Sequence, residues 1–406
     1  MRHNVYAVLV AVLALSATAP AQPRAKDGEW STYAADLAGS RYRPLDQIDA
    51  TNFNKLEVAW RFKTDSLGNR PEYKLEGTPL MVDGVVYATA GSRRAAIALD
   101  AATGELLWVH GEHEGARGAA APRQLSGRGL AYWTDGKVAR ILYVTPGYRL
   151  ISLDAKTGQR KWHFQLVHHP LWDMDISSAP ILADISVDGR PVKAVAQPTK
   201  QGFLYVLDRV SGKPVWPIPE QAVEKANVPG EWYSPTQPIP SKPRAYSRNG
   251  VFIEDLIDFT PALHDAALTL VAKYKLGPVY TPPVASQVAG PLATLTMGTA
   301  SGGTNWPGAS YDPETHTVYA YACNACVTPI GLLPSPKEIS DMNYIAGTAG
   351  QEVVFRMGPG ENAGADSPLP ARSAAPRTGG GGGLNIRQEV IRAVAHSPLS
   401  SRLTVS

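Results

Sequence analysis

A short phrase of residues occurs three times in this chain at a constant interval. Its aspartates, Asp100, Asp154 and Asp208, are 54 residues apart, and each follows a Leu and precedes an x-x-Thr-Gly or x-x-Ser-Gly sequence. A Trp stands eight residues after each aspartate. A fixed period of this size is typical of a repeat architecture built from one supersecondary unit. The chain is therefore expected to fold as a series of similar modules.

Each copy of the phrase predicts a tight turn between two strands. The aspartate can accept hydrogen bonds from backbone groups just ahead of it, and the glycine tolerates a positive φ. The strand after the turn runs to the Trp, which can pack between neighbouring sheets. Further strand-like runs lie upstream of the copies, at 80–88, 139–144 and 202–206, and the first contains an Asp83-Gly84 hairpin signal.

Strand, turn, strand and turn at this period predict the blades of a β-propeller, so the expected fold class is all-β. Trp60, which follows the strand-like residues 56–59, indicates the end of an earlier and less regular blade. About four to five blades can be recognised. The alternative is a β-sandwich with accidental similarity, which three copies in register make much less favourable.

Composition agrees with a fold rich in turns and excludes one class of partner. Only 18% of the residues are charged, and the chain contains 37 Gly and 34 Pro. The formal net charge is +3, and no basic stripe with interleaved aromatic residues is present. Nucleic acid is therefore not expected as a partner.

The first 21 residues have the pattern of a secretory signal peptide. Arg2 precedes an apolar run at 5–15, and small residues follow, with cleavage expected after Ala19 or Ala21. The run is short for a bilayer, and no later segment is long and apolar enough to span one. We expect no transmembrane segment and a periplasmic or secreted protein.

The rest of the chain divides into a propeller region and a tail. The propeller region is expected over 27–347, and it includes an insertion with apolar residues at helical spacing in 258–274. The tail, 348–406, is low in complexity, contains five consecutive glycines at 379–383, and is expected to be disordered.

The two cysteines, Cys323 and Cys326, form a C-x-x-C motif. In an exported chain they can form a local disulfide or remain free thiols. The same spacing also occurs in redox-active pairs and as half of a metal site. Neither a second Cys pair nor a nearby His cluster supports zinc here.

Several motifs resemble those of the pyrroloquinoline-quinone (PQQ) dependent dehydrogenases, and the glucose, polyol and alcohol dehydrogenases most closely. The similar stretches extend over about 28–347, and they are 36–42, 76–80, 127–133, 168–175, 197–202 and 234–238. The resemblance implies an eight-bladed propeller with PQQ and Ca²⁺ in its central channel. It also implies oxidation of an alcohol or sugar, with electrons passed to a membrane quinone or a cytochrome.

The resemblance assigns roles to five residues. Asp173 matches the catalytic base and a metal ligand, and Lys200 matches the cation that bonds the reactive quinone oxygen. Glu76, Arg128 and Asn305 match residues that hold the carboxylates and rim of the cofactor. These types suit the chemistry, because a carboxylate can take the hydroxyl proton while the quinone accepts hydride and a cation stabilises the developing oxyanion.

Each of these residues could also have a purely structural role. The chain also departs from the family pattern. Asp173 and Asp175 suit turns, and Lys200 suits a solvated turn. In the family, a long segment separates the residues that match 153–158 from those that match 168–169, whereas here the two stretches are directly joined. At the family's blade size, roughly two to three blades are expected to be absent. The absent part would include the Trp that stacks on the quinone and most of the metal ligands. The C-terminal blades are absent as well. The alternative function is a non-catalytic propeller remnant or binding scaffold.

Overall fold

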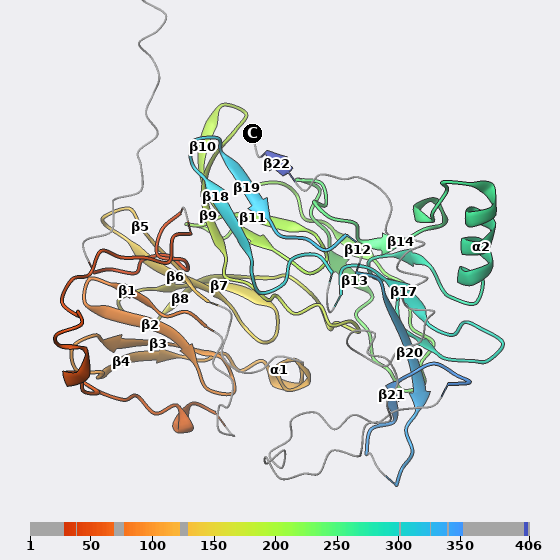
Figure 1. Ribbon diagram of the computed structural model, residues 1–406, viewed down its shortest axis with the longest axis horizontal. Coiled ribbons are helices and arrows are strands. Elements are labelled where there is room, and N and C mark those ends of the chain that lie inside the picture. Colours follow the sequence, from red (N-terminus) through yellow and green to blue (C-terminus); the bar gives the residue numbers. More distant parts are fainter. Residues whose placement is uncertain are drawn as a thin grey trace, which may run out of the picture.

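The computed structural model describes residues 28–37, 39–68, 77–121, 129–299, 302–324, 326–338, 341–351 and 402–404. These residues form mainly antiparallel sheets, arranged side by side from the left of Figure 1 to its right. The predicted signal peptide and nearly all of the predicted tail lie outside the described residues, so their limits remain predictions.

Two complete four-stranded blades come first, each with its strands in sequence order. Blade 1 consists of β1 (Leu80–Val82), β2 (Val85–Ala90), β3 (Ala95–Asp100) and β4 (Leu106–His110). Blade 2 consists of β5 (Ala131–Thr134), β6 (Ala139–Val144), β7 (Arg149–Asp154) and β8 (Arg160–Gln165). In both blades the register shifts immediately before the repeated Leu-Asp pair, between Ala98 and Leu99 in blade 1 and between Ser152 and Leu153 in blade 2.

Two further blades have fewer regular strands. Blade 3 consists of β9 (Ile181–Val187), β10 (Arg190–Pro198) and β11 (Leu204–Asp208), beside which the Val215 N–H donates to Val206 O at 3.0 Å. Blade 4 consists of β18 (Ala309–Asp312), β19 (Thr317–Ala320) and β22 (Arg402–Thr404). One detail of the sequence prediction was wrong: the run 202–206 is not a separate upstream strand but belongs mostly to β11, and β10 precedes it.

The repeated phrase forms the turn that its residues predict. Asp100 Oδ1 accepts from the backbone N–H of Thr103 at 2.8 Å and from its hydroxyl at 2.9 Å. Asp154 makes the same pair of bonds to Thr157, and Asp208 makes it to Ser211. The three turns are thus copies of one structure.

Trp60 and two of the three repeated tryptophans, Trp108 and Trp162, each bond the blade that follows them. The indole N–H of a Trp donates to a backbone carbonyl in the phrase turn of the following blade: Trp60 to Ala101 O at 3.1 Å, Trp108 to Ala155 O at 3.0 Å, and Trp162 to Arg209 O at 3.1 Å. The indole also covers the turn glycine, where an added Cβ would lie 2.6 Å from the ring in all three cases. Glycine is therefore required both for the positive φ and for this contact.

Trp108→Ala is expected to lower the free energy of unfolding by about 3 kcal/mol, because it removes an indole that packs against the cluster between blades 1 and 2 and bonds the turn of blade 2. Trp108→Phe keeps most of the apolar contact and is expected to cost about 1 kcal/mol for the lost hydrogen bond. Urea denaturation measures both, with Trp306→Ala as the control, since Trp306 is 52% exposed. An equal loss of unfolding free energy in Trp108→Ala and Trp306→Ala would contradict a role of Trp108 in joining blades 1 and 2.

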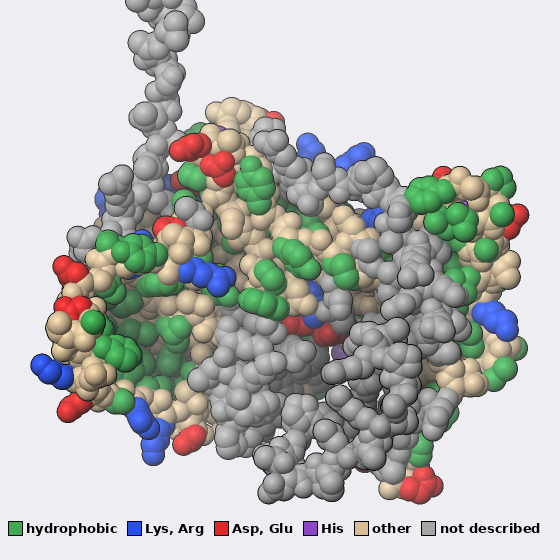
Figure 2. Space-filling model, in the orientation of Figure 1, with side chains coloured by type: hydrophobic (Ala, Val, Ile, Leu, Met, Phe, Trp, Pro, Cys, Tyr) green, Lys and Arg blue, Asp and Glu red, His purple; other side chains and the backbone are tan. Residues whose placement is uncertain are grey.

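The core follows the blade interfaces. Separate clusters of buried apolar residues lie between blades 1 and 2, between blades 2 and 3, and between blades 3 and 4. On its other side, blade 1 has no preceding blade among the described residues. Figure 2 shows hydrophobic side chains in a hollow at the place where Figure 1 draws blade 1.

The insertion after blade 3 is made of short strands and one helix. Its strands are β12 (Glu220–Ala222), β13 (Thr236–Pro238), β14 (Gly250–Val251), β15 (Gly277–Pro278), β16 (Val284–Ala285) and β17 (Thr294–Thr296), with β20 (Thr328–Pro334) and β21 (Tyr344–Ala346) from beyond blade 4. The predicted helix is confirmed as α2 (Pro261–Val271), whose Ala267 and Val271 pack in a cluster with Leu295 and Met297. A shorter helix, α1 (Gly115–Ala120), follows blade 1.

The structure decides one alternative that the sequence left open. Cys323 and Cys326 are joined in a local disulfide, and the Cys323 N–H donates to Gly303 O at 3.2 Å. Across the described ranges, no helix combines the length and the apolar character that a bilayer crossing requires.

Candidate functional site

A buried lysine between two aspartates is the most chemically distinctive feature of the structure. Lys200 Nζ bonds Asp175 Oδ1 and lies 3.5 Å from Asp173 Oδ2. The Lys200 and Asp175 side chains are only 3% and 7% exposed, while that of Asp173 is 36% exposed. The resemblance predicted that Asp173 and Lys200 act together, and the structure does bring them together.

The backbone around Lys200 is held in place by the start of blade 4. The Thr304 N–H donates to Thr199 O at 3.0 Å, and Tyr246 Oη accepts from the Thr199 N–H at 3.1 Å. Gly303, with φ +55°, packs directly against the Lys200 carbonyl, where an added Cβ would lie 2.0 Å from the oxygen. Only glycine fits at that position, so the Lys200 turn is fixed from both sides.

The two aspartates differ in their affinity for a proton. Burial raises the pKa of Asp173, and the neighbouring Asp175 carboxylate raises it further, although Lys200 acts in the opposite direction. Burial also tends to raise the pKa of Asp175, but its direct ion pair with Lys200 outweighs this and lowers the pKa. Asp175 is therefore the constant counterion of Lys200, and Asp173 is the carboxyl group that can exchange a proton.

Asp173 also has free hydrogen-bonding capacity. Its Oδ1 atom is buried and has no hydrogen-bond partner in the part of the chain that the structure describes. Unsatisfied buried polar groups are rare in native proteins and indicate a place for a ligand or ordered water.

Three further residues belong to this site that sequence reasoning did not assign to it. Asp175 stands two residues from Asp173, a spacing that places both on one side of an extended segment and could have revealed it. Tyr148 is 1% exposed, and its pKa is raised by burial and then by the charges of Asp175 and Asp173. Arg94 is 5% exposed and contributes to the lowered pKa of Asp175. No pattern in the sequence connects Tyr148 or Arg94 to the aspartates.

The structure says less about the three other predicted site residues, Asn305, Glu76 and Arg128. Asn305 directly follows Thr304, is half-buried, and accepts a hydrogen bond from the Trp306 N–H on its Oδ1 atom at 2.9 Å. Glu76 and Arg128 lie outside the described residues, so their predicted contacts with a cofactor remain predictions.

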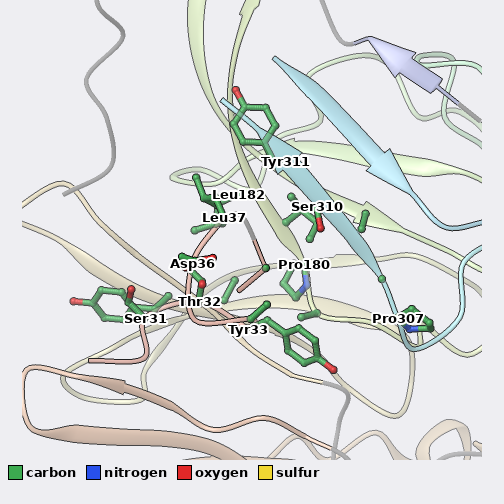
Figure 3. Close-up of a pocket in the computed structure, with 18 of the residues that line it drawn as sticks. Ser31, Thr32, Tyr33, Asp36, Leu37, Pro180, Leu182, Pro307, Ser310 and Tyr311 are labelled. Carbon is green, nitrogen blue, oxygen red and sulfur yellow. The ribbon is translucent and has the colours of Figure 1, made fainter. Parts of the chain in front are cut away.

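A separate cavity of about 350 Å³ is lined by none of Lys200, Asp173 and Asp175 (Figure 3). It lies between the segment 31–41 and the first strands of blades 2, 3 and 4, which contribute Tyr132, Leu182 and Tyr311. The first strands of consecutive blades thus converge around one space, which has the size of a small-molecule site.

Comparison with known proteins agrees with this architecture. The family model described as "PQQ: Glucose/ethanol/alcohol dehydrogenase, beta-propeller domain" matches residues 30–160 and 150–366. The dehydrogenase subunit of the quinone alcohol dehydrogenase of Gluconobacter oxydans (strain 621H) is 35% identical over 240 residues, which cover 55% of this chain and 29% of that protein. The quinoprotein glucose dehydrogenase of Escherichia coli (strain K12) is 44% identical over 90 residues, covering 22% and 11%.

A solved quinohemoprotein alcohol dehydrogenase from Pseudomonas putida HK5 is similar with a TM-score of 0.43 and 22% identity, over 73% of this chain and 34% of that one. The chain thus spans less than a third of the length of the curated relatives named above. The family model covers most of the chain, and its β-propeller description agrees with the repeated, interlocked blades. The chain belongs to the family of PQQ-dependent glucose, ethanol and alcohol dehydrogenases, as an incomplete β-propeller.

Proposed function

We propose that this chain is a quinoprotein dehydrogenase unit that oxidises the hydroxyl group of an alcohol or sugar. The observation that carries the proposal is the buried Lys200 between two carboxyl groups, of which Asp173 has a raised pKa and an oxygen without a partner. A carboxyl group with a perturbed pKa beside a cation is a common feature of catalytic sites.

The residues present suit the polar edge of PQQ better than they suit a metal ion. A buried ammonium group and a carboxylate oxygen can bond quinone oxygens, and they are supplied by Lys200 and Asp173. A Ca²⁺ ion needs six to eight oxygen ligands. The described residues contain no group of three His, Cys, Asp or Glu that could hold a metal. The roles proposed below therefore do not depend on calcium, and Asp173 is the one described residue proposed as a calcium ligand.

The proposed roles follow from the charges. Asp173 accepts the hydroxyl proton of the substrate in its ionised form. PQQ, when bound, supplies the acceptor for the hydride. Lys200 holds its positive charge beside the reacting oxygen, and Asp175 fixes the position of Lys200. Glu76, Arg128 and Asn305 are proposed to hold the cofactor's carboxylates and rim, as the resemblance implies.

The proposed cellular location rests on the residue pattern of 1–21. Residues 1–21 are proposed to direct export to the periplasm or beyond the cell. Residues 348–406 are proposed to be a low-complexity, disordered tail after the propeller region, 27–347, apart from the strand β22 (Arg402–Thr404). The electrons are proposed to pass to a membrane quinone or a cytochrome. A non-catalytic propeller remnant or binding scaffold is the second candidate, and it is supported by the lack, among the described residues, of a group of three His, Cys, Asp or Glu that could hold a metal.

Reconstitution of the full chain separates the two candidates. With PQQ and Ca²⁺ added, the enzyme proposal expects quenching of intrinsic tryptophan fluorescence at micromolar PQQ and reduction of an artificial electron acceptor in the presence of glucose or a simple alcohol. The scaffold proposal expects neither. PQQ binding without acceptor reduction by any alcohol or sugar would also contradict the enzyme proposal.

A further inference from the structure

The disulfide between Cys323 and Cys326 joins two parts of the fold, and the proposed function makes no use of it. Both cysteines stand between the end of β19 at Ala320 and the start of β20 at Thr328. The strand β19 belongs to blade 4, whereas β20 pairs with β17 of the insertion (Figure 1). The bond therefore cross-links segments that different sheets hold in place.

The segment that contains Cys323 holds the start of blade 4 against the turn at Lys200. The Cys323 N–H donates to Gly303 O at 3.2 Å. An added Cβ at Gly303 would lie 2.0 Å from the Lys200 carbonyl oxygen, and the next residue, Thr304, donates its N–H to Thr199 O at 3.0 Å. The pair Gly303 and Thr304 thus lies between the disulfide and the Lys200 turn.

The segment that follows the disulfide holds the same turn through a second strand. Thr328, the first residue of β20, pairs with Thr296 on β17, and Thr296 Oγ1 donates to Thr328 O at 2.8 Å. Shortly after Thr296 comes Gly298, where an added Cβ would lie 3.1 Å from the Lys200 carbonyl oxygen. The Lys200 carbonyl therefore packs against both Gly303 and Gly298, and the disulfide ties together the segments that support these two glycines.

The bond is better suited to reversible reduction than to stabilising the whole fold. The stabilisation that a cross-link provides grows with the length of chain that it encloses, and these cysteines are only three positions apart. Both are half-buried, and the nearby Tyr321 is 53% exposed. Accessible disulfides are the more easily reduced ones. The sequence contains no other cysteine, so reduction cannot lead to a different pairing within it.

We propose that Cys323 and Cys326 form a redox-responsive site whose state sets how firmly the Lys200 turn is held. A dithiol attacks the bond through a mixed disulfide. The S–S bond breaks, the dithiol gives up two electrons and two protons as it forms its own disulfide, and each cysteine sulfur gains one proton. In the reduced protein the segments that support Gly303 and Gly298 are no longer cross-linked, so the Lys200 turn opens more often. This proposal does not depend on the proposed catalytic function.

Hydrogen exchange of the full, folded chain tests the proposal, with dithiothreitol as the dithiol. Millimolar dithiothreitol is expected to reduce the bond without unfolding, as measured by alkylation and mass spectrometry. The N–H groups of Gly202 and Thr304, which both donate to Thr199 O at 3.0 Å, are expected to exchange at least about tenfold faster in the reduced protein. The control amides are those of Gly104 and Gly158, in the repeated turns of blades 1 and 2, and their exchange should not change.

The double variant Cys323→Ser, Cys326→Ser cannot form the bond. It is expected to exchange like the reduced protein and not to respond to dithiothreitol, whereas reoxidation of the wild type should restore slow exchange. Ala322→Ser, a half-buried position in the same segment, is the matched control and should keep both the disulfide and the slow exchange.

Three results would each overturn the proposal. The first is a bond that dithiothreitol reduces only after urea has unfolded the chain. The second is unchanged exchange at Gly202 and Thr304 after reduction. The third is an equal acceleration at Gly104 and Gly158, which would mean that reduction loosens the whole fold. The reduced wild type decides among these results even where the double variant does not fold.

Discussion

Asp173→Asn is expected to reduce kcat/KM for the best alcohol or sugar substrate by about 10²–10⁴-fold in the reconstituted protein. The amide has nearly the shape of the carboxyl group but cannot accept the substrate proton. Lys200 keeps its bond to Asp175 in this variant, so the fold and PQQ binding are expected to be retained. Steady-state assays with an artificial acceptor, together with fluorescence titration of PQQ, measure the two effects separately.

The raised pKa of Asp173 also predicts the direction in which the reaction rate changes with pH. Burial raises the pKa of Asp173, so the proton leaves at a higher pH than the ordinary aspartate value of about 3.9. The rate should therefore increase with pH through an acid limb that lies above that value, and the limb should be lost in Asp173→Asn. Asp188→Asn, in the exposed hairpin between β9 and β10, is the matched control and should leave the rate unchanged. An unaltered rate in Asp173→Asn would refute the role of Asp173 as base.

The repeat features of the fold were predictable from sequence because their causes are local. The Asp-x-x-Thr-Gly turn depends on bonds within four residues, and it was confirmed at Asp100, Asp154 and Asp208. The packing of Trp108 and Trp162 between blades was also confirmed. The hydrogen-bond partner of each indole could not be predicted from the repeat, because the carbonyl that accepts the bond lies 47 residues further along the chain.

The candidate site was predictable only in part. The resemblance paired Asp173 with Lys200, but the nearer counterion of Lys200 is Asp175, which the sequence equally allowed as a turn residue. Tyr148 and Arg94 reach the aspartates from blade 2 and blade 1, with φ of +67° and +50°. Such backbone conformations are uncommon for these residue types and persist where the surrounding structure imposes them. The positions of Tyr148 and Arg94 depend on tertiary packing, so no local sequence pattern predicts them.

Lys200→Met is expected to lower the free energy of unfolding by about 3–5 kcal/mol, the largest stability effect of any single substitution considered for this chain. The change leaves the Asp175 carboxylate, 7% exposed, without the ammonium group that bonds it. Urea denaturation at neutral pH measures the loss. The matched control is Lys275→Met, because Lys275 pairs with Glu224 at the surface, with side chains 25% and 57% exposed. That pair is expected to contribute less than about 1 kcal/mol.

Two further measurements separate loss of the charge pair from loss of packing. Asp175→Asn in the Lys200→Met background removes the unpaired charge, so at least about half of the lost stability should return if charge is the cause. The pH dependence provides the second measurement. The lowered pKa of Asp175 contributes stability above the ordinary aspartate pKa of about 3.9, and this contribution disappears as the pH falls. The gap between wild type and Lys200→Met should therefore narrow at acid pH, because protonation of Asp175 removes the penalty in the variant. A gap that is constant with pH, with no rescue by Asp175→Asn, would mean that Lys200 contributes through packing and not through its charge.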